Sequence, residues 1–239
     1  MSVRLYLRSP LALAWTLFAV VLIGAVVLGG WLLGAALIPA AAAGSELLGG
    51  LLSLGIGAVV VALAAVLWVP AGAAIAYIVG HRARGRSVSA GATNAALRRH
   101  RVDLYRWCKT RVAVVDRLAE RLLDEADVSR TEVAAGCGPY VVPALLLDAP
   151  RLPAAVERAN RVVPTPGRQR RLYRGTAATF AAAAVVAIPG VVVRGGVDEF
   201  VGGAVLAVAV VGAVVTAALD AAWRASTYAQ AETENGFTG

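Results

Sequence analysis

Residues that usually carry catalysis or hold a metal are scarce in this sequence. It contains two histidines, two cysteines and one lysine. The spacings among His81, His100, Cys108 and Cys137 fit no zinc pattern. The phosphate-binding loop GxxxxGK(S/T), the zinc motif HExxH and the nucleophile motif GxSxG are also missing. We therefore predict no catalytic, cofactor-binding or metal-binding residues, and no enzymatic activity.

Charge is almost missing from four long apolar runs. They cover residues 11–38, 51–79, 176–193 and 200–222, and Asp220 is the only charged residue inside them. A helix needs about 20 apolar residues to cross the ~30 Å hydrocarbon core of a membrane. Hydrophobic residues make up 59% of the chain, whereas soluble domains have roughly 45–50%. The sequence therefore predicts an all-α, polytopic transmembrane helix bundle with four spans.

Basic residues are distributed unevenly between the segments that flank these runs. Arg4 and Arg8 precede the first run, residues 81–174 carry 19 basic and 9 acidic residues, and only Arg194 falls on the opposite side. Positive charge in short flanking loops stays in the cytoplasm. The first run is too long for the apolar region of a signal peptide, so we expect it to be retained. We predict a multi-pass protein of the cell membrane with both termini in the cytoplasm.

This topology divides the chain into an N-terminal transmembrane hairpin (1–80), a cytoplasmic-side segment (81–174), a C-terminal hairpin (175–224) and a tail (225–239). Arginines close to a membrane are attracted to anionic headgroups by about 1 kcal/mol each. The centre of the cytoplasmic-side segment is acidic, which disfavours nucleic acid. We therefore expect membrane lipids as the partner. The predicted headgroup contacts are Arg82, Arg84, Arg86, Arg168, Arg170, Arg171 and Arg174.

The cytoplasmic-side segment contains an amphipathic stretch followed by a broken apolar one. Apolar residues recur at three- and four-residue steps from Leu104 to Leu122, which predicts an amphipathic helix. Residues 133–147 are apolar but short, and glycine and proline interrupt them. Because proline breaks or kinks a helix, we predict a broken helix that is re-entrant or forms a half-span. Its candidate functional residues are Gly136, Gly138, Pro139, Pro143 and the following Asp148.

Part of this region resembles a known element. Residues 141–163 read VVPALLLDAPRLPAAVERANRVV. This stretch resembles an element of uncharacterised archaeal and bacterial polytopic membrane proteins related to the membrane domain of glycerophosphodiester phosphodiesterases. Pro143, Asp148 and Pro153 match the end of its apolar helix, its acidic turn and the proline before a short amphipathic helix. The C-terminal stretch 218–237 is similar to the way such proteins end.

The resemblance implies a different number of spans. It makes the two segments before Pro143 membrane helices, which gives six membrane segments in total. Here the first of them carries seven charged residues, among them Arg106, Asp116 and Glu120. A six-segment bundle with one polar, inward-facing helix is therefore the alternative to four spans with amphipathic or re-entrant helices on the cytoplasmic side.

Three functions are compatible with this organisation. Small residues at four-residue spacing, such as Gly30 and Gly34, favour close helix packing within the chain, with a second copy or with another membrane protein. We expect a non-enzymatic membrane accessory or scaffold protein. The alternative is a small-molecule or lipid transporter component with the broken helix as its binding site. A second alternative is a lipid-headgroup enzyme, for which Asp148 with Glu157, or Asp220, would supply the carboxylates. We expect Asp220 to reach the interface.

Overall fold

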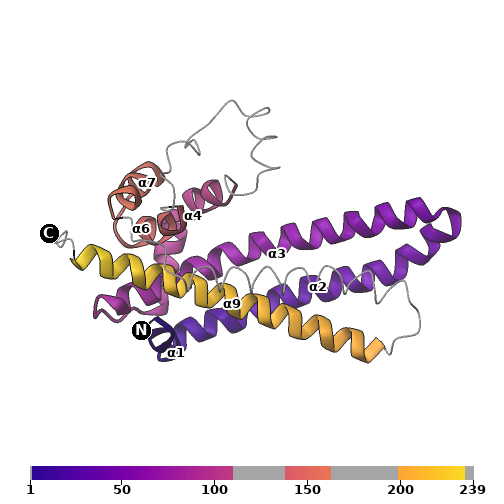
Figure 1. Ribbon diagram of the computed structural model, residues 1–239, viewed down its shortest axis with the longest axis horizontal. Helices are drawn as coiled ribbons and strands as arrows, with labels where there is room; N and C mark the ends of the chain where they lie inside the picture. The colour runs from indigo at the N-terminus through magenta and orange to yellow at the C-terminus, as the bar shows by residue number, and fades with distance from the viewer. Residues whose placement is uncertain (1, 110–137, 163–198, 235–239) are drawn as a thin grey trace. The chain divides into compact units, whose positions relative to one another are not determined.

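The computed structural model describes residues 2–109, 138–162 and 199–234, and every regular element in these ranges is helical (Figure 1). This confirms the predicted all-α class. Three helices are long: α2 (Pro10–Gly44), α3 (Glu46–Ala83) and α9 (Glu199–Glu234). Each has the length and composition to cross a membrane. The predicted run 176–193 lies outside the described residues, so the fourth span stays a prediction.

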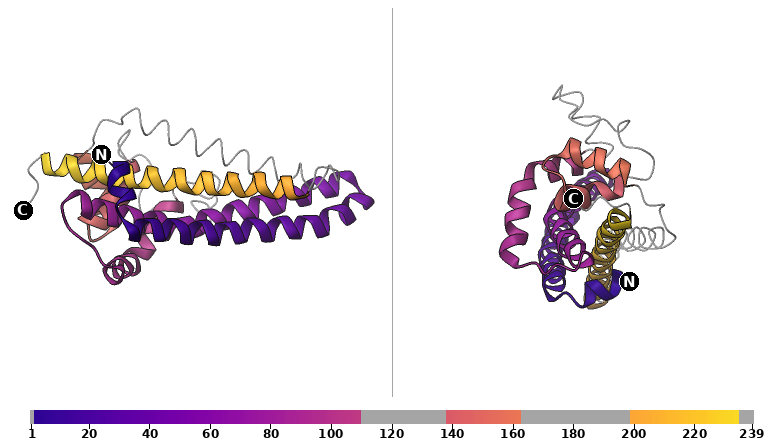
Figure 2. Two further views of the ribbon diagram at one scale, coloured as in Figure 1. Left: turned by 90° about the horizontal axis from the view of Figure 1, so that it is seen from below. Right: turned by 90° about the vertical axis from the view of Figure 1, so that its left-hand side faces the viewer.

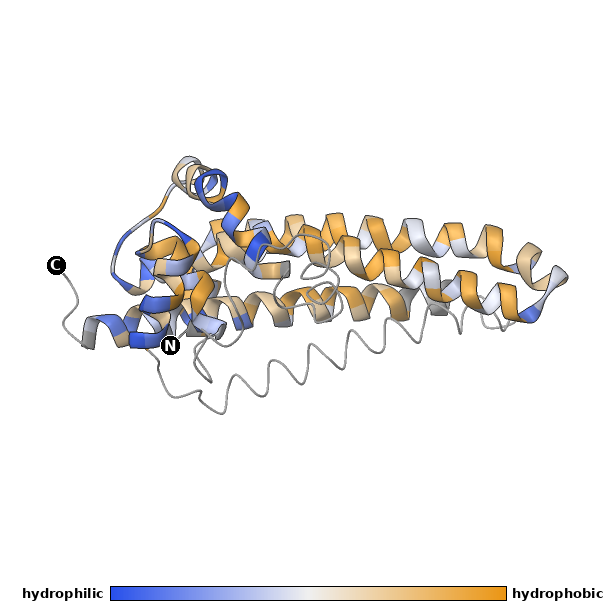
Figure 3. Ribbon diagram, turned by 90° about the horizontal axis from the view of Figure 1, so that it is seen from above, coloured by the Kyte–Doolittle hydropathy of each residue, from blue (hydrophilic) through white to orange (hydrophobic). Residues whose placement is uncertain are grey.

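The remaining described elements are short. They are α1 (Ser2–Leu7), α4 (Ala90–Lys109), the 3₁₀ helix η2 (Gly138–Tyr140), α6 (Val141–Leu147) and α7 (Leu152–Arg161). Hydrophobic residues dominate most of the length of the long helices, whereas hydrophilic residues gather in α4, in α7 and in the last turns of α9 (Figure 3). The predicted amphipathic helix is described only as far as Lys109, where it belongs to α4. Helix α4 begins at Ala90, and the Ser89 Oγ caps it by accepting a hydrogen bond from the Ala92 N–H at 3.2 Å.

The connection between α2 and α3 is shorter than the 12 residues, 39–50, that separate the first two apolar runs of the sequence. Helix α2 continues through Pro39 to Gly44, and Ser45 alone separates it from α3. Proline removes one backbone donor, but the alanines that follow it favour helix. The Ser45 N–H donates to the Ala41 carbonyl at 3.1 Å. A Cβ at Gly49 would lie 2.9 Å from the Ala42 Cβ, so glycine is needed where the two helices meet.

The chain forms two compact units. The polar unit, as we call it, comprises Met1–Trp15, Val69–Arg170 and Ala218–Gly239; the apolar unit comprises Thr16–Trp68 and Arg171–Ala217. Every arginine that the structure describes belongs to the polar unit. The described part of the apolar unit contains neither arginine nor lysine. The long helices contribute residues to both units.

The apolar unit exposes side chains that a soluble protein would bury. Leu17, Leu47, Leu54 and Val208 are 65%, 75%, 72% and 66% exposed. Burial of such side chains away from water is worth about 1.5–3 kcal/mol each, so hydrocarbon is the solvent that suits this surface. Inside the unit, a Cβ at Gly30 would lie 2.2 Å from a Val60 methyl group. Gly30 therefore serves packing within the chain, one of the roles that its spacing predicts.

The polar unit has a conventional core. Helix α6 packs against α4, α7 and η2, and its residues Val141, Ala144 and Leu145 are almost completely buried. The end of α3 contributes Ile75, Ile78 and Val79 to this core. A Cβ at Gly80 would lie 2.6 Å from a methyl group of Leu147, so the end of α6 closely approaches α3.

The predicted broken helix is described from Gly138 onward, as η2 followed by α6. The break lies at Tyr140, the N-cap of α6, and not at a kink in mid-helix. Pro143 falls in the first turn of α6, where its missing N–H has no intrahelical partner to lose. The ten residues from Gly138 to Leu147 are too few to cross a membrane of ~30 Å.

Candidate functional site

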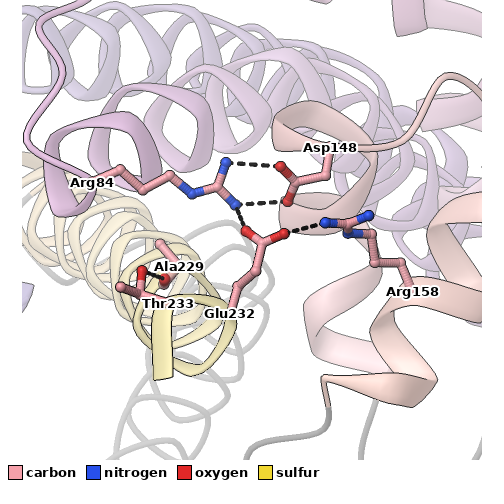
Figure 4. A network of polar contacts seen from close by, with 6 residues as sticks. All are labelled: Arg84, Asp148, Arg158, Ala229, Glu232 and Thr233. Atoms are coloured by element: carbon pink, nitrogen blue, oxygen red, sulfur yellow. Dashed lines mark hydrogen bonds and ion pairs between the residues drawn. The ribbon is translucent and has the colours of Figure 1, made fainter. Parts of the chain in front are cut away.

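Four charged side chains from separate parts of the chain meet inside the polar unit (Figure 4). The Arg84 Nη1 donates to the Asp148 Oδ1 at 2.8 Å, and its Nη2 donates to the Asp148 Oδ2 at 2.7 Å. The same Nη2 donates to Glu232, whose second carboxylate oxygen accepts from Arg158. We call these four residues the ion network. It joins the end of α3, the end of α6, helix α7 and the end of α9.

The position of Arg84 is set by the way α3 ends. Gly85 has a φ of 73°, in the left-handed region that favours glycine. The Gly85 N–H donates to the Arg82 carbonyl at 3.0 Å, and the Arg86 N–H donates to the His81 carbonyl at 2.9 Å. This pair of bonds is a Schellman motif. It stops α3 and holds Arg84 at the last turn, facing α6.

Two prolines place the partners from α6 and α7. Pro150 cannot continue α6, and it favours an extended conformation in the residue before it. Asp148 therefore caps α6, with its N–H donating to the Ala144 carbonyl at 3.1 Å. Pro153, in the first turn of α7, starts the next helix. One and a half turns later, α7 presents Arg158 to Glu232.

Glu232 is the last member of a polar stripe along α9. Asp220, Arg224, Tyr228 and Glu232 follow one another at four-residue intervals, so they lie on one side of the helix. Asp220 pairs with Arg224, and Tyr228 and Glu232 are buried. The Tyr228 hydroxyl lies close enough to Asp148 to interact with it, but without the geometry of a well-formed hydrogen bond. We call these four residues the α9 stripe.

Burial and pairing act in opposite directions on these groups. Burial disfavours ionised Asp148, but the hydrogen bonds and charge of Arg84 outweigh it, so the pKa of Asp148 lies below its ordinary value. Burial also opposes the charge of Arg84, yet Asp148 and Glu232 raise the pKa of Arg84. The hydrogen bond to Glu232 raises the pKa of Arg158. All three groups are therefore charged at neutral pH.

The network suits a structural clamp. Its two positive and two negative charges cancel, and the exposed fractions of Arg84, Asp148 and Glu232 are only 14%, 13% and 5%. Removing one member of such a buried set leaves its partners uncompensated, which costs about 3–5 kcal/mol. The bidentate pairing occupies both oxygens of Asp148. In the described ranges no three His, Cys, Asp or Glu side chains gather as metal ligands.

The residues of the predicted broken helix lie in different surroundings. Gly138, Pro139 and Pro143 are buried in the packed interior of the polar unit. Asp148 is brought into the ion network. Gly136 lies outside the described residues. Glu157, the carboxylate considered with Asp148 for an enzyme, pairs instead with Arg161 on the exposed surface of α7.

The seven arginines predicted to contact lipid headgroups also differ in their surroundings. Arg84 has Asp148 and Glu232 as partners in place of lipid, and its side chain is mostly buried. Arg82 donates to the backbone carbonyl of Arg8 at 2.5 Å, and Arg86 is exposed. For Arg82 and Arg86 a headgroup contact stays a prediction. The other four, Arg168, Arg170, Arg171 and Arg174, lie outside the described residues.

Sequence reasoning did not identify three residues of the ion network and the α9 stripe. Glu232, Arg158 and Tyr228 were not singled out, although the four-residue spacing of the α9 stripe was visible in the sequence. Asp220 was expected to reach the interface. It is 7% exposed, pairs with Arg224, and its Oδ1 has no hydrogen-bond partner among the described residues. Its position relative to the membrane interface stays a prediction. A partner one turn away lets the carboxylate remain buried.

The chain matches no protein-family model, no curated protein and no solved structure. The resemblance to membrane proteins related to glycerophosphodiester phosphodiesterases therefore stays a prediction.

Proposed function

We propose that this chain is a multi-pass protein of the cytoplasmic membrane, with both termini in the cytoplasm, that acts without catalysis as a membrane-embedded accessory or scaffold. The ion network is the observation that carries this proposal. It clamps α6 and α7 onto the ends of α3 and α9, and two of these helices have the length of a span. A rigid helical platform on membrane anchors is what a scaffold requires.

The distribution of charge supports the orientation. All described arginines belong to the polar unit, and both ends of the chain belong to it as well. Positive residues that flank spans stay in the cytoplasm. The polar unit is therefore the part that would meet cytoplasmic partners, and the exposed leucines and valines of the apolar unit would meet lipid.

Native complexes test the scaffold role. We expect tagged wild-type chain, extracted in mild detergent from cells that naturally contain it, to migrate on blue-native gels as a complex larger than the purified chain. Arg84→Ala should insert into the membrane but migrate like the purified chain, because the platform loses its clamp. The control is Arg161→Ala, which removes an exposed ion pair of α7 and should leave the complex intact. Wild-type chain that migrates alone would contradict the proposal.

A second candidate is the transporter component, and the α9 stripe favours it. Asp220 and Arg224 form a buried ion pair in a helix long enough to span a membrane, and ionisable residues at such places mark substrate or ion pathways. If the chain is a transporter component, Asp220→Asn should abolish substrate flux across the membrane of proteoliposomes. The complex seen on blue-native gels should remain intact in this variant. A scaffold would show no flux in either protein.

A further inference from the structure

The outward face of α4 carries three arginines around a small apolar patch. Arg98, Arg99 and Arg101 are all exposed. Val102 is 53% exposed and Tyr105 is 43% exposed. Positions three and four apart share one side of a helix, so Arg98, Val102 and Tyr105 form the centre of this face, and the other two arginines flank it. We call these five residues the α4 face.

The orientation of the α4 face is fixed by the opposite side of the helix. Thr93, His100, Leu104 and Trp107 are buried, and α4 packs against α6 and α7. Asp103, the only acidic residue of α4, is half-buried at the margin. The arginines therefore point away from the core of the polar unit and cannot be neutralised by the carboxylates of the ion network, which are already paired.

We propose that the α4 face binds the anionic headgroup surface of the membrane in which α3 is inserted. The guanidinium groups of Arg98, Arg99 and Arg101 contact lipid phosphates, and Val102 and Tyr105 enter the interface. Interfacial helices combine basic residues with apolar and aromatic ones in this way. The inference rests on the membrane insertion contained in the proposed function, and it is independent of the scaffold role.

Covalent connection keeps the α4 face near the membrane. Six residues, 84–89, separate the end of α3 from the start of α4, and a linker of that length reaches at most about 25 Å. Within the polar unit, α4 lies across the view while the ends of α3 and α9 are seen nearly end-on (right panel of Figure 2). Within the polar unit, α4 therefore crosses the end of α3 and does not continue its direction.

These observations favour a lipid surface over an acidic protein. The short linker holds α4 beside the end of α3, the helix that the proposed function inserts in the membrane, whereas a protein would have to be recruited. The α4 face is also strongly basic, with no carboxylate among its exposed members. Juxtamembrane basic residues are drawn to the anionic cytoplasmic leaflet over roughly a Debye length. Both the charge and the location of the α4 face therefore favour an anionic lipid surface.

A fluorescent probe on the α4 face tests this. In a full-length Cys108→Ala, Cys137→Ala background, Val102→Cys is labelled with an environment-sensitive fluorophore. We expect blue-shifted emission, and quenching by nitroxide lipids, in nanodiscs containing phosphatidylglycerol. The shift should be much weaker with phosphatidylcholine alone and should fall at high salt. Arg98→Gln, Arg99→Gln and Arg101→Gln together should shift the equilibrium between the membrane-bound and free α4 face toward the free state, by about fivefold for each arginine removed. The blue shift with phosphatidylglycerol should then be lost.

Matched controls separate charge from folding. Arg151→Gln with Arg161→Gln changes exposed arginines of α7 and should leave the response unchanged. Circular dichroism in detergent should be identical for all variants. Equal emission in both kinds of nanodisc would overturn the proposal, and so would a shift that requires an added cytosolic extract, because the occupant would then be a protein. Labelling of Ser45→Cys from the opposite side checks insertion, so failure of the proposed function would be recognised separately.

Discussion

At the scale of the residue, Asp148 illustrates how a carboxylate is kept charged inside a protein. Its two oxygens accept both arms of the Arg84 guanidinium, which offsets the cost of leaving water. The same residue looked like a candidate for chemistry in the sequence, because an acidic turn followed a broken apolar helix. Its partners were unpredictable, since Arg84 and Glu232 lie 64 residues before and 84 residues after it in the chain.

Substitution of Asp148 should reveal the size of this contribution. We expect Asp148→Asn to lower the free energy of unfolding by about 3 kcal/mol at neutral pH, because the charge of Arg84 loses its closest partner. Glu157→Gln is the matched control, since the side chain of Glu157 is 65% exposed in its ion pair with Arg161, and exposed pairs contribute only about 0–1 kcal/mol. Thermal unfolding in detergent measures both. Equal destabilisation by the two substitutions would show that the ion network is not a clamp.

The depressed pKa of Asp148 also predicts a pH dependence with a definite sign. A carboxyl group whose pKa is lower in the folded protein stabilises it fully above the ordinary value of about 3.9. That stabilisation is lost as the pH falls from there through the depressed pKa. We expect the stability difference between wild type and Asp148→Asn to be constant from pH 7 to about 5 and to shrink below about 4. A difference that grows on acidification would contradict this assignment.

At the scale of the element, the helices were predictable and their ends were not. Long apolar runs without charge indicate spans, and each described run lies within a long helix. The ends depend on finer details. Pro39 looked like the start of a turn, yet α2 passes through it, because a proline costs one backbone hydrogen bond and alanines on its C-terminal side support the helix. The Schellman motif at Gly85 required a backbone angle that sequence alone does not supply.

Gly49 and Gly50 provide an experiment on the α2–α3 hairpin. A Cβ at Gly49 would meet both the Cβ and the Cα of Ala42, at 2.9 and 3.1 Å, whereas a Cβ at Gly50 would meet nothing within 4 Å. We expect Gly49→Ala to destabilise the hairpin by about 1–3 kcal/mol, because backbone cannot easily move aside. Gly50→Ala should be neutral or stabilising by up to about 1 kcal/mol. Thermal unfolding measures the stability of both variants. Equal stability of Gly49→Ala and Gly50→Ala would mean that α2 and α3 do not approach each other closely at Gly49.

At the scale of the whole molecule, composition and charge predicted a membrane protein, and the structure adds the separation of arginines from the apolar unit. The ion network and the α4 face could not be predicted as sites, because each depends on which helix faces are covered. The predicted amphipathic stretch began only at Leu104, so it did not indicate that Arg98, Arg99 and Arg101 would remain on the outside. Their exposure depends on which side of α4 packs against α6 and α7, and this packing exists only in the folded chain.

Cysteine labelling tests the proposed orientation. In a Cys137→Ala variant, a membrane-impermeant maleimide should reach Cys108 only from the cytoplasmic side of sealed vesicles. The reaction should be slow and should accelerate with pH, because burial raises the pKa of the Cys108 thiol and maleimide reacts with the thiolate. Ser45→Cys, at the exposed connection of the hairpin, should react only from the other side. Labelling of both positions from one side would exclude this topology.

The length of α3 has a further consequence for the bilayer around the protein. The apolar run inside it, residues 51–79, measures about 44 Å at 1.5 Å per residue, about one and a half times the ~30 Å hydrocarbon thickness. A hydrophobic mismatch of this size has to be absorbed by tilting the helix, by thickening the surrounding lipid, or by keeping part of the helix in contact with protein. Thick, ordered bilayers reduce that mismatch, so the chain should partition toward them over thin ones.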